Sequence, residues 1–294
     1  MRRSLAVTAV AAALLLAACG SSTNNAASSS APAGSESASP SPTSTCSPDS
    51  LETVTPGTLT VATGEPVFEP WVVGDKPESG EGFEAAVAYA VAEQLGYTKD
   101  QVTWIRTTFD SAIAPGPKDF DFNIQQYGIT ADRDEVVDFS DGYYTVQQAV
   151  VALPDSDVAN AESVSDLQSA TLGAGVGTTS LDYIEEVIQP GTDAAVFDDT
   201  AAASSVLAAG QVDGLVYDLP TAFYITAVEI PDASIVGILP VVGDAEELGM
   251  LFEEGSPLVP CVNEALAAVE ESGDLAALQE EWLANGGETP TLSE

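Results

Sequence analysis

The sequence predicts an α/β fold with mostly parallel sheets, divided into two lobes. Predicted strands alternate with predicted helices, which is typical of this class. The alternation occurs in two consecutive series, about 51–145 and 149–242, and two further helical segments follow the second series. The apolar fraction of 45% in 294 residues is sufficient for a sizeable core.

The first series begins with an apolar strand and contains one long helix. Phe83, Val87, Val91 and Leu95 recur at helical spacing, and Gly96 ends this helix. Apolar runs bounded by turn residues predict the strands at 58–63, 102–106, 120–124 and 136–139.

The second series begins with the apolar, β-branched run at 146–153. The same patterns predict strands at 171–174, 212–217 and 234–242, with helices at 180–188, at 201–209 and from Pro220. Helices at 257–271 and 275–283, separated by Gly273, close the chain.

The N-terminus has the pattern of an export signal. Arg2 and Arg3 precede an apolar stretch from Leu5 to Leu16, which is too short to span a bilayer. The run 16–19, Leu-Ala-Ala-Cys, resembles a bacterial lipobox and implies that residues 1–18 are a signal peptide and that Cys19 is acylated. The alternative is an ordinary signal peptide with a chance cysteine. Residues 19–48, rich in Ser, Ala, Thr and Pro, are expected to be a flexible linker spanning roughly 30 Å.

Two cysteines remain in the exported chain, and an oxidising compartment favours a disulfide between Cys46 and Cys261 over two free thiols. The disulfide would return the C-terminal helices to the first series, so that the chain crosses twice between lobes and forms a hinge over a cleft. The expected division is 49–145 plus 246–294 for lobe one and 146–245 for lobe two.

The charge balance limits the function classes. The chain has 46 Asp+Glu, 7 Lys+Arg and no His. Binding of nucleic acid needs clustered basic residues and is excluded. Without His, Ser–His and Cys–His catalysis are excluded, as is the commonest metal ligand, and we expect no catalytic residue, metal or cofactor. Adjacent acids such as Glu246-Glu247 are expected to be solvated, because neighbouring residues do not face each other.

Three places at the carboxyl ends of predicted strands carry groups that suit a small ligand. Arg133 could pair with a carboxylate through its planar guanidinium; alternatively it forms a surface ion pair with Asp132 or Asp134. The loop 175–179, Gly-Val-Gly-Thr-Thr, could bind an anion through Thr178, Thr179 and backbone N–H groups, or these threonines only cap the helix.

Asp218, directly after the strand at 212–217, could hold an ammonium group or cap the helix at Pro220. Together with Arg133 it would complement an α-amino acid. Three aromatic residues near strand ends could line a side-chain pocket or belong to the core: Phe68, Trp71 and Phe109.

The chain resembles the amino-acid-binding proteins of ABC importers, solute-binding protein family 3, over about 51–285. The matching segments are Gly57–Thr63, Gly82–Glu84, Ile129–Tyr144, Gly175–Thr179, Gly210–Asp218 and Pro257–Trp282. The resemblance implies the two-lobed periplasmic-binding-protein fold of type II.

The resemblance also implies roles for individual residues. It assigns the ligand carboxylate to Arg133 and Thr179 and the α-ammonium to Asp218. Gln126 and the N–H of Gly128 would contribute polar contacts, and Phe68 would cover the ligand. Two positions depart from the pattern: Gly128 replaces a common Ser, and Gly64 stands where binders of basic amino acids often carry Asp, a role that Glu65 or Glu69 could take.

The resemblance implies a monomer that works outside the cytoplasm and passes an amino acid to an ABC permease, which a separate ATPase powers. The acylated Cys19 would hold this monomer on the membrane. We expect that the protein is not an enzyme. The alternatives are a lipoprotein that senses the ligand without transport and a dehydratase-like enzyme on the same fold.

Overall fold

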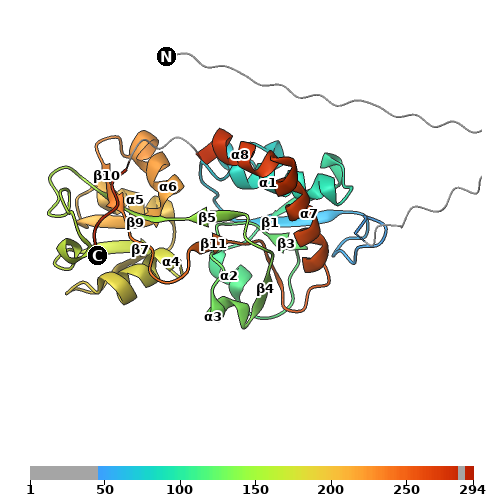
Figure 1. Ribbon diagram of the computed structural model, residues 1–294, viewed down its shortest axis with the longest axis horizontal. Helices are drawn as coiled ribbons and strands as arrows, with labels where there is room; N and C mark the ends of the chain where they lie inside the picture. The colour runs from blue at the N-terminus through green and yellow to red at the C-terminus, as the bar shows by residue number, and fades with distance from the viewer. Residues whose placement is uncertain (1–45, 284–288) are drawn as a thin grey trace, which may run out of the picture. The chain divides into compact units, whose positions relative to one another are not determined.

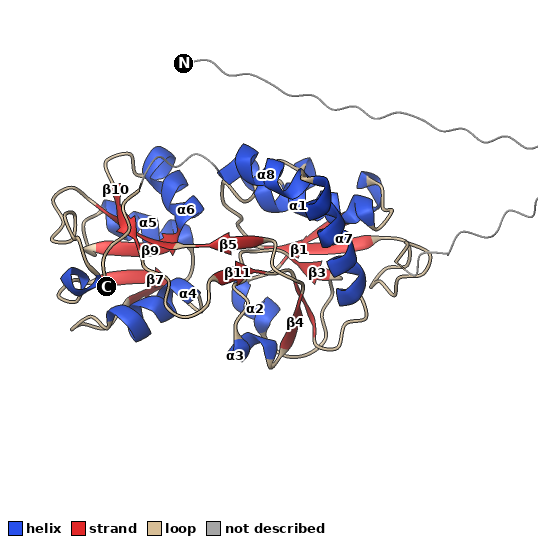
Figure 2. Cartoon of the chain, in the orientation of Figure 1, coloured by secondary structure: helices blue, strands red, loops and turns tan. Residues whose placement is uncertain are grey.

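A computed structural model describes residues 46–283 and 289–294. It confirms the α/β class: two five-stranded sheets with helices on both faces are joined by a two-stranded sheet (Figures 1 and 2). The predicted signal peptide, Cys19 and the linker up to residue 45 lie outside the described residues. Within the described part of the chain, no helix combines the length and apolarity needed to cross a membrane.

Lobe one is built on the sheet of order β2-β1-β3-β12-β4. Its strands are β1 (Leu59–Thr63), β2 (Val102–Arg106), β3 (Phe122–Asn123), β4 (Val137–Phe139) and β12 (Leu251–Glu253). Three helices pack together on one face, namely α1 (Phe83–Gln94), α7 (Val259–Ser272) and α8 (Asp274–Leu283) (Figure 2). Two short helices lie on the other side, α2 (Phe109–Ile113) and α3 (Ala131–Asp134).

Lobe two is built on the sheet of order β10-β6-β9-β7-β8. Its strands are β6 (Gln148–Ala152), β7 (Leu172–Gly175), β8 (Ala195–Phe197), β9 (Gly214–Asp218) and β10 (Ser234–Ile238). Side chains of β6 alternate between two cores, as strand geometry requires. Val150 packs with α4 (Thr179–Asp182) and the π-helix that continues it (Tyr183–Ile188), whereas Val151 packs with α5 (Thr200–Ala208) and α6 (Leu219–Tyr224).

The sheets are mixed, whereas the sequence predicted mostly parallel sheets. In lobe one, β12 runs antiparallel to β3 and β4; in lobe two, β6 runs antiparallel to β9 and β10. The physical reason is the connection: each of these strands enters its lobe directly from the joining sheet, without a crossover helix to reverse its direction.

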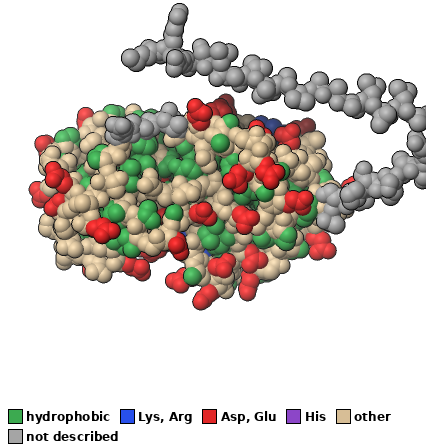
Figure 3. Space-filling model, in the orientation of Figure 1, with side chains coloured by type: hydrophobic (Ala, Val, Ile, Leu, Met, Phe, Trp, Pro, Cys, Tyr) green, Lys and Arg blue, Asp and Glu red, His purple; other side chains and the backbone are tan. Residues whose placement is uncertain are grey.

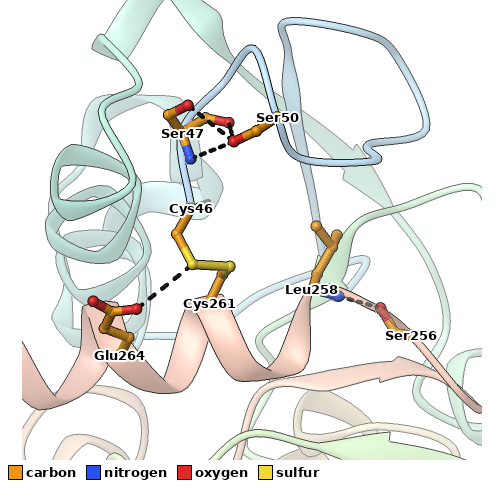
Figure 4. Close-up of a disulfide and its surroundings, with 7 residues drawn as sticks. All are labelled: Cys46, Ser47, Ser50, Ser256, Leu258, Cys261 and Glu264. Atoms are coloured by element: carbon orange, nitrogen blue, oxygen red, sulfur yellow. Dashed lines mark hydrogen bonds between the residues drawn. A yellow bond between two sulfur atoms is a disulfide. The ribbon is translucent and has the colours of Figure 1, made fainter. Parts of the chain in front are cut away.

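The joining sheet pairs β5 (Tyr144–Val146) with β11 (Glu246–Leu248) and lies between the two larger sheets (Figure 1). The predicted disulfide between Cys46 and Cys261 is present and ties the start of the described chain to α7 (Figure 4). Helices α7 and α8 pack on α1 in the lobe-one core.

The last residues contact lobe two, although the expected division placed them in lobe one. The backbone N–H of Leu292 donates to the carbonyl of Ile238, and that of Val164 donates to Ser293. The Leu292 side chain is buried in the lobe-two core. The other expected lobe boundaries remain predictions.

Candidate functional site between the lobes

A cavity of about 350 Å³ lies between residues of the two lobes. Seven of the nine residues predicted to bind a ligand line it: Phe68, Phe109, Gln126, Arg133, Thr178, Thr179 and Asp218. Trp71 and Gly128 are not among the lining residues. The lining comes mainly from the loops that follow β1, β2, β3, β7 and β8 and from the end of β9, so the strand ends of both sheets meet here.

Arg133, on the short helix α3, is buried, with 8% of its surface exposed. Its Nη1 donates to the carbonyl of Gly128 at 2.6 Å, and its Nη2 donates to Gly177 of lobe two at 2.8 Å. The guanidinium also stacks over the Phe109 ring at 5.4 Å. Among the described residues the only salt bridge joins Arg106 and Asp75, so Arg133 is not a surface ion pair. Burial lowers its pKa, and several acids, Asp182 first, oppose this effect.

In the loop after β7, the two threonines have different partners. Thr178 caps α4: its hydroxyl accepts from the N–H of Leu181 and donates to the carbonyl of Gly175. Thr179 begins α4, and its hydroxyl donates to Oε1 of Glu246 at 2.6 Å. Thr178 therefore caps the helix and also lines the cavity.

Asp218, the last residue of β9, does not cap α6 with its side chain. Its Oδ1 accepts from Nε2 of Gln148, its partner on β6, at 2.7 Å. Ser180 fixes the orientation of this amide by donating to its Oε1 at 2.6 Å. Burial, and then the charge of Glu246, raise the pKa of Asp218 to about 7.

Gln126 has a positive φ of 49°, a conformation that side chains disfavour. Glu84, fully buried at the start of α1, holds it there by accepting from the Gln126 backbone N–H at 2.6 Å and from its side-chain amide. Tyr143 also donates to Glu84, at 2.6 Å. Burial raises the pKa of Glu84 to about 7. The Gln126 side chain therefore donates a hydrogen bond to Glu84 and also lines the cavity.

The three predicted aromatic residues divide into two groups. Phe68 and Phe109 line the cavity, and Phe109 stacks on Tyr127. Trp71 is buried in the core, with 1% exposure, and packs against Tyr144 of the hinge strand β5. Its indole N–H donates to the Thr221 hydroxyl on α6 at 2.8 Å, which is a direct hydrogen bond between the lobes.

The expectation that Glu246 is a solvated charge is wrong. Its carboxylate accepts from Thr179 and, at 3.0 Å, from Gln148, so it belongs to the polar network behind the cavity. The pairing of β11 with β5 positions it, and no local pattern in the sequence indicates this pairing. Gln148, also missed, had one signal: it is the polar first residue of an apolar strand.

The family model of bacterial extracellular solute-binding proteins, family 3, matches residues 59–285. The L-cystine-binding protein TcyJ of Escherichia coli (strain K12) is 27% identical over 68% of this chain and 73% of its own length. The arginine-binding extracellular protein ArtP of Bacillus subtilis (strain 168) is also 27% identical, over 68% of this chain and 77% of its own.

Solved structures of amino-acid-binding proteins are also similar to this chain. An ancestral arginine-binding protein bound to arginine superimposes with a TM-score of 0.65 at 30% identity, covering 76% of this chain and 97% of that one. An ancestral amino-acid-binding protein, a precursor of cyclohexadienyl dehydratase, has a TM-score of 0.64 at 29% identity, with 77% and 95% covered. The two-lobed type II fold is thus confirmed, and the chain belongs to family 3 of the bacterial extracellular solute-binding proteins.

Proposed function

We propose that this protein captures an amino acid in the cavity between its lobes and delivers it to an ABC permease. The observation that carries the proposal is a pair of opposite charges. Arg133 from lobe one and Asp218 from lobe two face one cavity and do not form a salt bridge with each other. An α-amino acid carries the complementary pair of charges on one carbon atom.

Arg133 is assigned to the ligand carboxylate. Its partners in the structure are backbone carbonyls and a ring, which fix the guanidinium without neutralising its charge. The four N–H bonds of the two Nη atoms exceed the two hydrogen bonds they make here, so donors remain for a carboxylate. A ligand that contacts Arg133 of lobe one and Asp218 of lobe two at the same time would favour closed lobes.

Asp218 is assigned to the α-ammonium group. Its carboxylate is held by a neutral amide, so its charge is uncompensated, and burial together with the charge of Glu246 raises its pKa. An ammonium group placed against it would supply the missing positive charge.

The rest of the cavity favours a cationic side chain on the ligand. Phe68 and Phe109 provide flat apolar surface, and the remaining charged residues of the lining are all acidic: Glu65, Asp110, Asp198 and Asp199. Glu65 thus lies where it could replace the missing Asp at position 64, whereas Glu69 is not in the lining. ArtP and the ancestral relative are named for arginine, which agrees with this preference, whereas TcyJ is named for L-cystine, so the acidic lining carries this part of the proposal.

We propose binding without catalysis, since the chain has no His and both Cys46 and Cys261 are locked in a disulfide. Acylation of Cys19 would hold a monomer on the outer face of the membrane, and a separate ATPase would power transport. Loss of amino-acid uptake after deletion of the gene for this protein would separate transport from sensing alone.

The proposal is tested by thermal-shift screening against the twenty amino acids, because a ligand at a hundred times its Kd stabilises by about 2.7 kcal/mol. We expect a basic amino acid to give the largest shift. Arg133→Ala should weaken binding of that amino acid by about 2–5 kcal/mol, or roughly 30- to several-thousand-fold, and leave the circular dichroism spectrum unchanged. Equal affinity of the variant and wild type would contradict the assigned carboxylate site.

A further inference from the structure

The hydroxyl of Thr179 faces the cavity as a hydrogen-bond acceptor. A threonine hydroxyl has one proton, and a carboxylate oxygen can only accept. In the 2.6 Å contact between Thr179 Oγ1 and Glu246 Oε1, the proton therefore belongs to the bond with Glu246. Only lone pairs of Thr179 remain for a ligand in the cavity.

The Glu246 carboxylate is held in this position from three sides. Its Oε2 accepts from Gln148 Nε2 at 3.0 Å, and the strand pairing of β11 with β5 fixes its backbone. Gly128 leaves room for it: a Cβ atom at this glycine would lie 2.5 Å from Glu246 Oε1. The hinge thus fixes the backbone of Glu246, lobe two supplies both hydrogen bonds to its carboxylate, and lobe one leaves space for it.

We infer that Glu246 is a positioning residue that makes the lobe-two wall selective for a cationic group. Through its hold on the Thr179 proton, it places an acceptor in the cavity wall that also contains the carboxylate of Asp218. The carboxylate of the ligand is then left to Arg133 and backbone N–H groups of the cavity wall. This inference rests on the proposed function and changes the role of Thr179 from binding the ligand carboxylate to binding its ammonium group.

Replacement of Glu246 by Gln should reverse the polarity of Thr179. Gln148 cannot turn its amide, because its Nε2 donates to Asp218 and its Oε1 accepts from Ser180. The new amide at position 246 must therefore offer its oxygen to Gln148 and its nitrogen to Thr179. Thr179 would then accept from this nitrogen and turn its own proton toward the cavity.

The experiment measures calorimetric Kd values for three probes. They are the amino acid that stabilises the wild type most among the twenty, the same molecule without its α-ammonium group, and the same molecule without its carboxylate. For Glu246→Gln we expect roughly 10- to 100-fold weaker binding of the two probes that carry the ammonium group. The probe without it should bind as tightly as before or more tightly.

Four further variants make the result specific. Glu247→Gln is the matched control, since it removes the same charge from the adjacent, exposed residue and should change no Kd. Thr179→Val should match the loss seen in Glu246→Gln, and the double variant should be no worse than either single one, whereas Thr179→Ser should bind like the wild type.

Equal weakening of all three probes by Glu246→Gln, or no change in any of them, would overturn the inference while leaving the proposed function intact. An unchanged Kd in Thr179→Val would also overturn it. If no amino acid bound the wild type, the proposed function would fail and this inference with it.

Discussion

Glu84 should make the protein less stable as the pH rises through neutrality. Its pKa is about 7 in the folded chain, against 4.5 for an ordinary glutamate, because burial outweighs the hydrogen bonds from Tyr143 and Gln126. Between these two values the folded state binds more protons than the unfolded state, so the free energy of unfolding falls with rising pH. The difference corresponds to about 3 kcal/mol in total, of which about 2–3 kcal/mol is lost between pH 5 and pH 8.

The variant Glu84→Gln removes this titration. Its carbonyl oxygen can still accept from the Gln126 N–H and from Tyr143, and the Gln126 amide can turn its oxygen toward the new NH₂ group. We therefore expect equal stability of variant and wild type near pH 5 and a variant that is more stable by about 2–3 kcal/mol at pH 8.

Urea unfolding followed by circular dichroism at pH 5, 6, 7 and 8, without added amino acids, measures both curves. Glu93→Gln, an exposed position on the same helix, is the matched control and should give a curve parallel to that of the wild type. If the curve of Glu84→Gln were parallel to that of the wild type as well, the buried carboxylate would not titrate in this range and the reasoning would be refuted.

Three further predictions concern binding and location. Affinity for the amino acid should fall up to tenfold per pH unit below pH 7, where Asp218 becomes protonated, and Asp218→Asn should bind weakly at every pH, as calorimetry from pH 5.5 to 8 would show. Ligand should change the tryptophan fluorescence of the wild type but not of Trp71→Phe, because Trp71 bonds across the lobes to Thr221; an equal change in both would place the signal elsewhere. Wild-type protein should enter the detergent phase and Cys19→Ser should not, since a diacylglyceryl group anchors stably; a processed variant still in membranes would contradict lipid anchoring.

Regular elements of the fold were predictable from the sequence because their apolar periodicity reflects burial on a strand or helix face. The strand 102–106 and the helix that begins at Phe83 agree with β2 and α1. The elements missed are short and depend on tertiary contacts. Helix α3 has four residues, and β11 exists only through its pairing with β5, so neither carries a local signal strong enough to identify it.

The candidate site was predictable where a residue was unusual for its surroundings. Arg133 stood out because the chain has so few basic residues, and Asp218 because it ends an apolar strand. Trp71 shows the limit of this reasoning: an aromatic residue near a strand end can face a cavity or the core, and only packing decides. Glu246 was hidden for the opposite reason, as one acid among 46.

The same excess of acids explains how the site is built. Acidic side chains are spread over the visible surface (Figure 3), where water solvates them. After Arg2 and Arg3 the sequence offers five basic residues, so buried carboxylates must be held by neutral donors. Gln126 and Tyr143 hold Glu84, and the Gln148 amide is shared by Asp218 and Glu246. Neutral donors satisfy hydrogen bonds without cancelling charge, so burial and the charge of Glu246 raise the pKa of Asp218 although the Gln148 amide lowers it, and a positive charge is what this carboxylate still lacks.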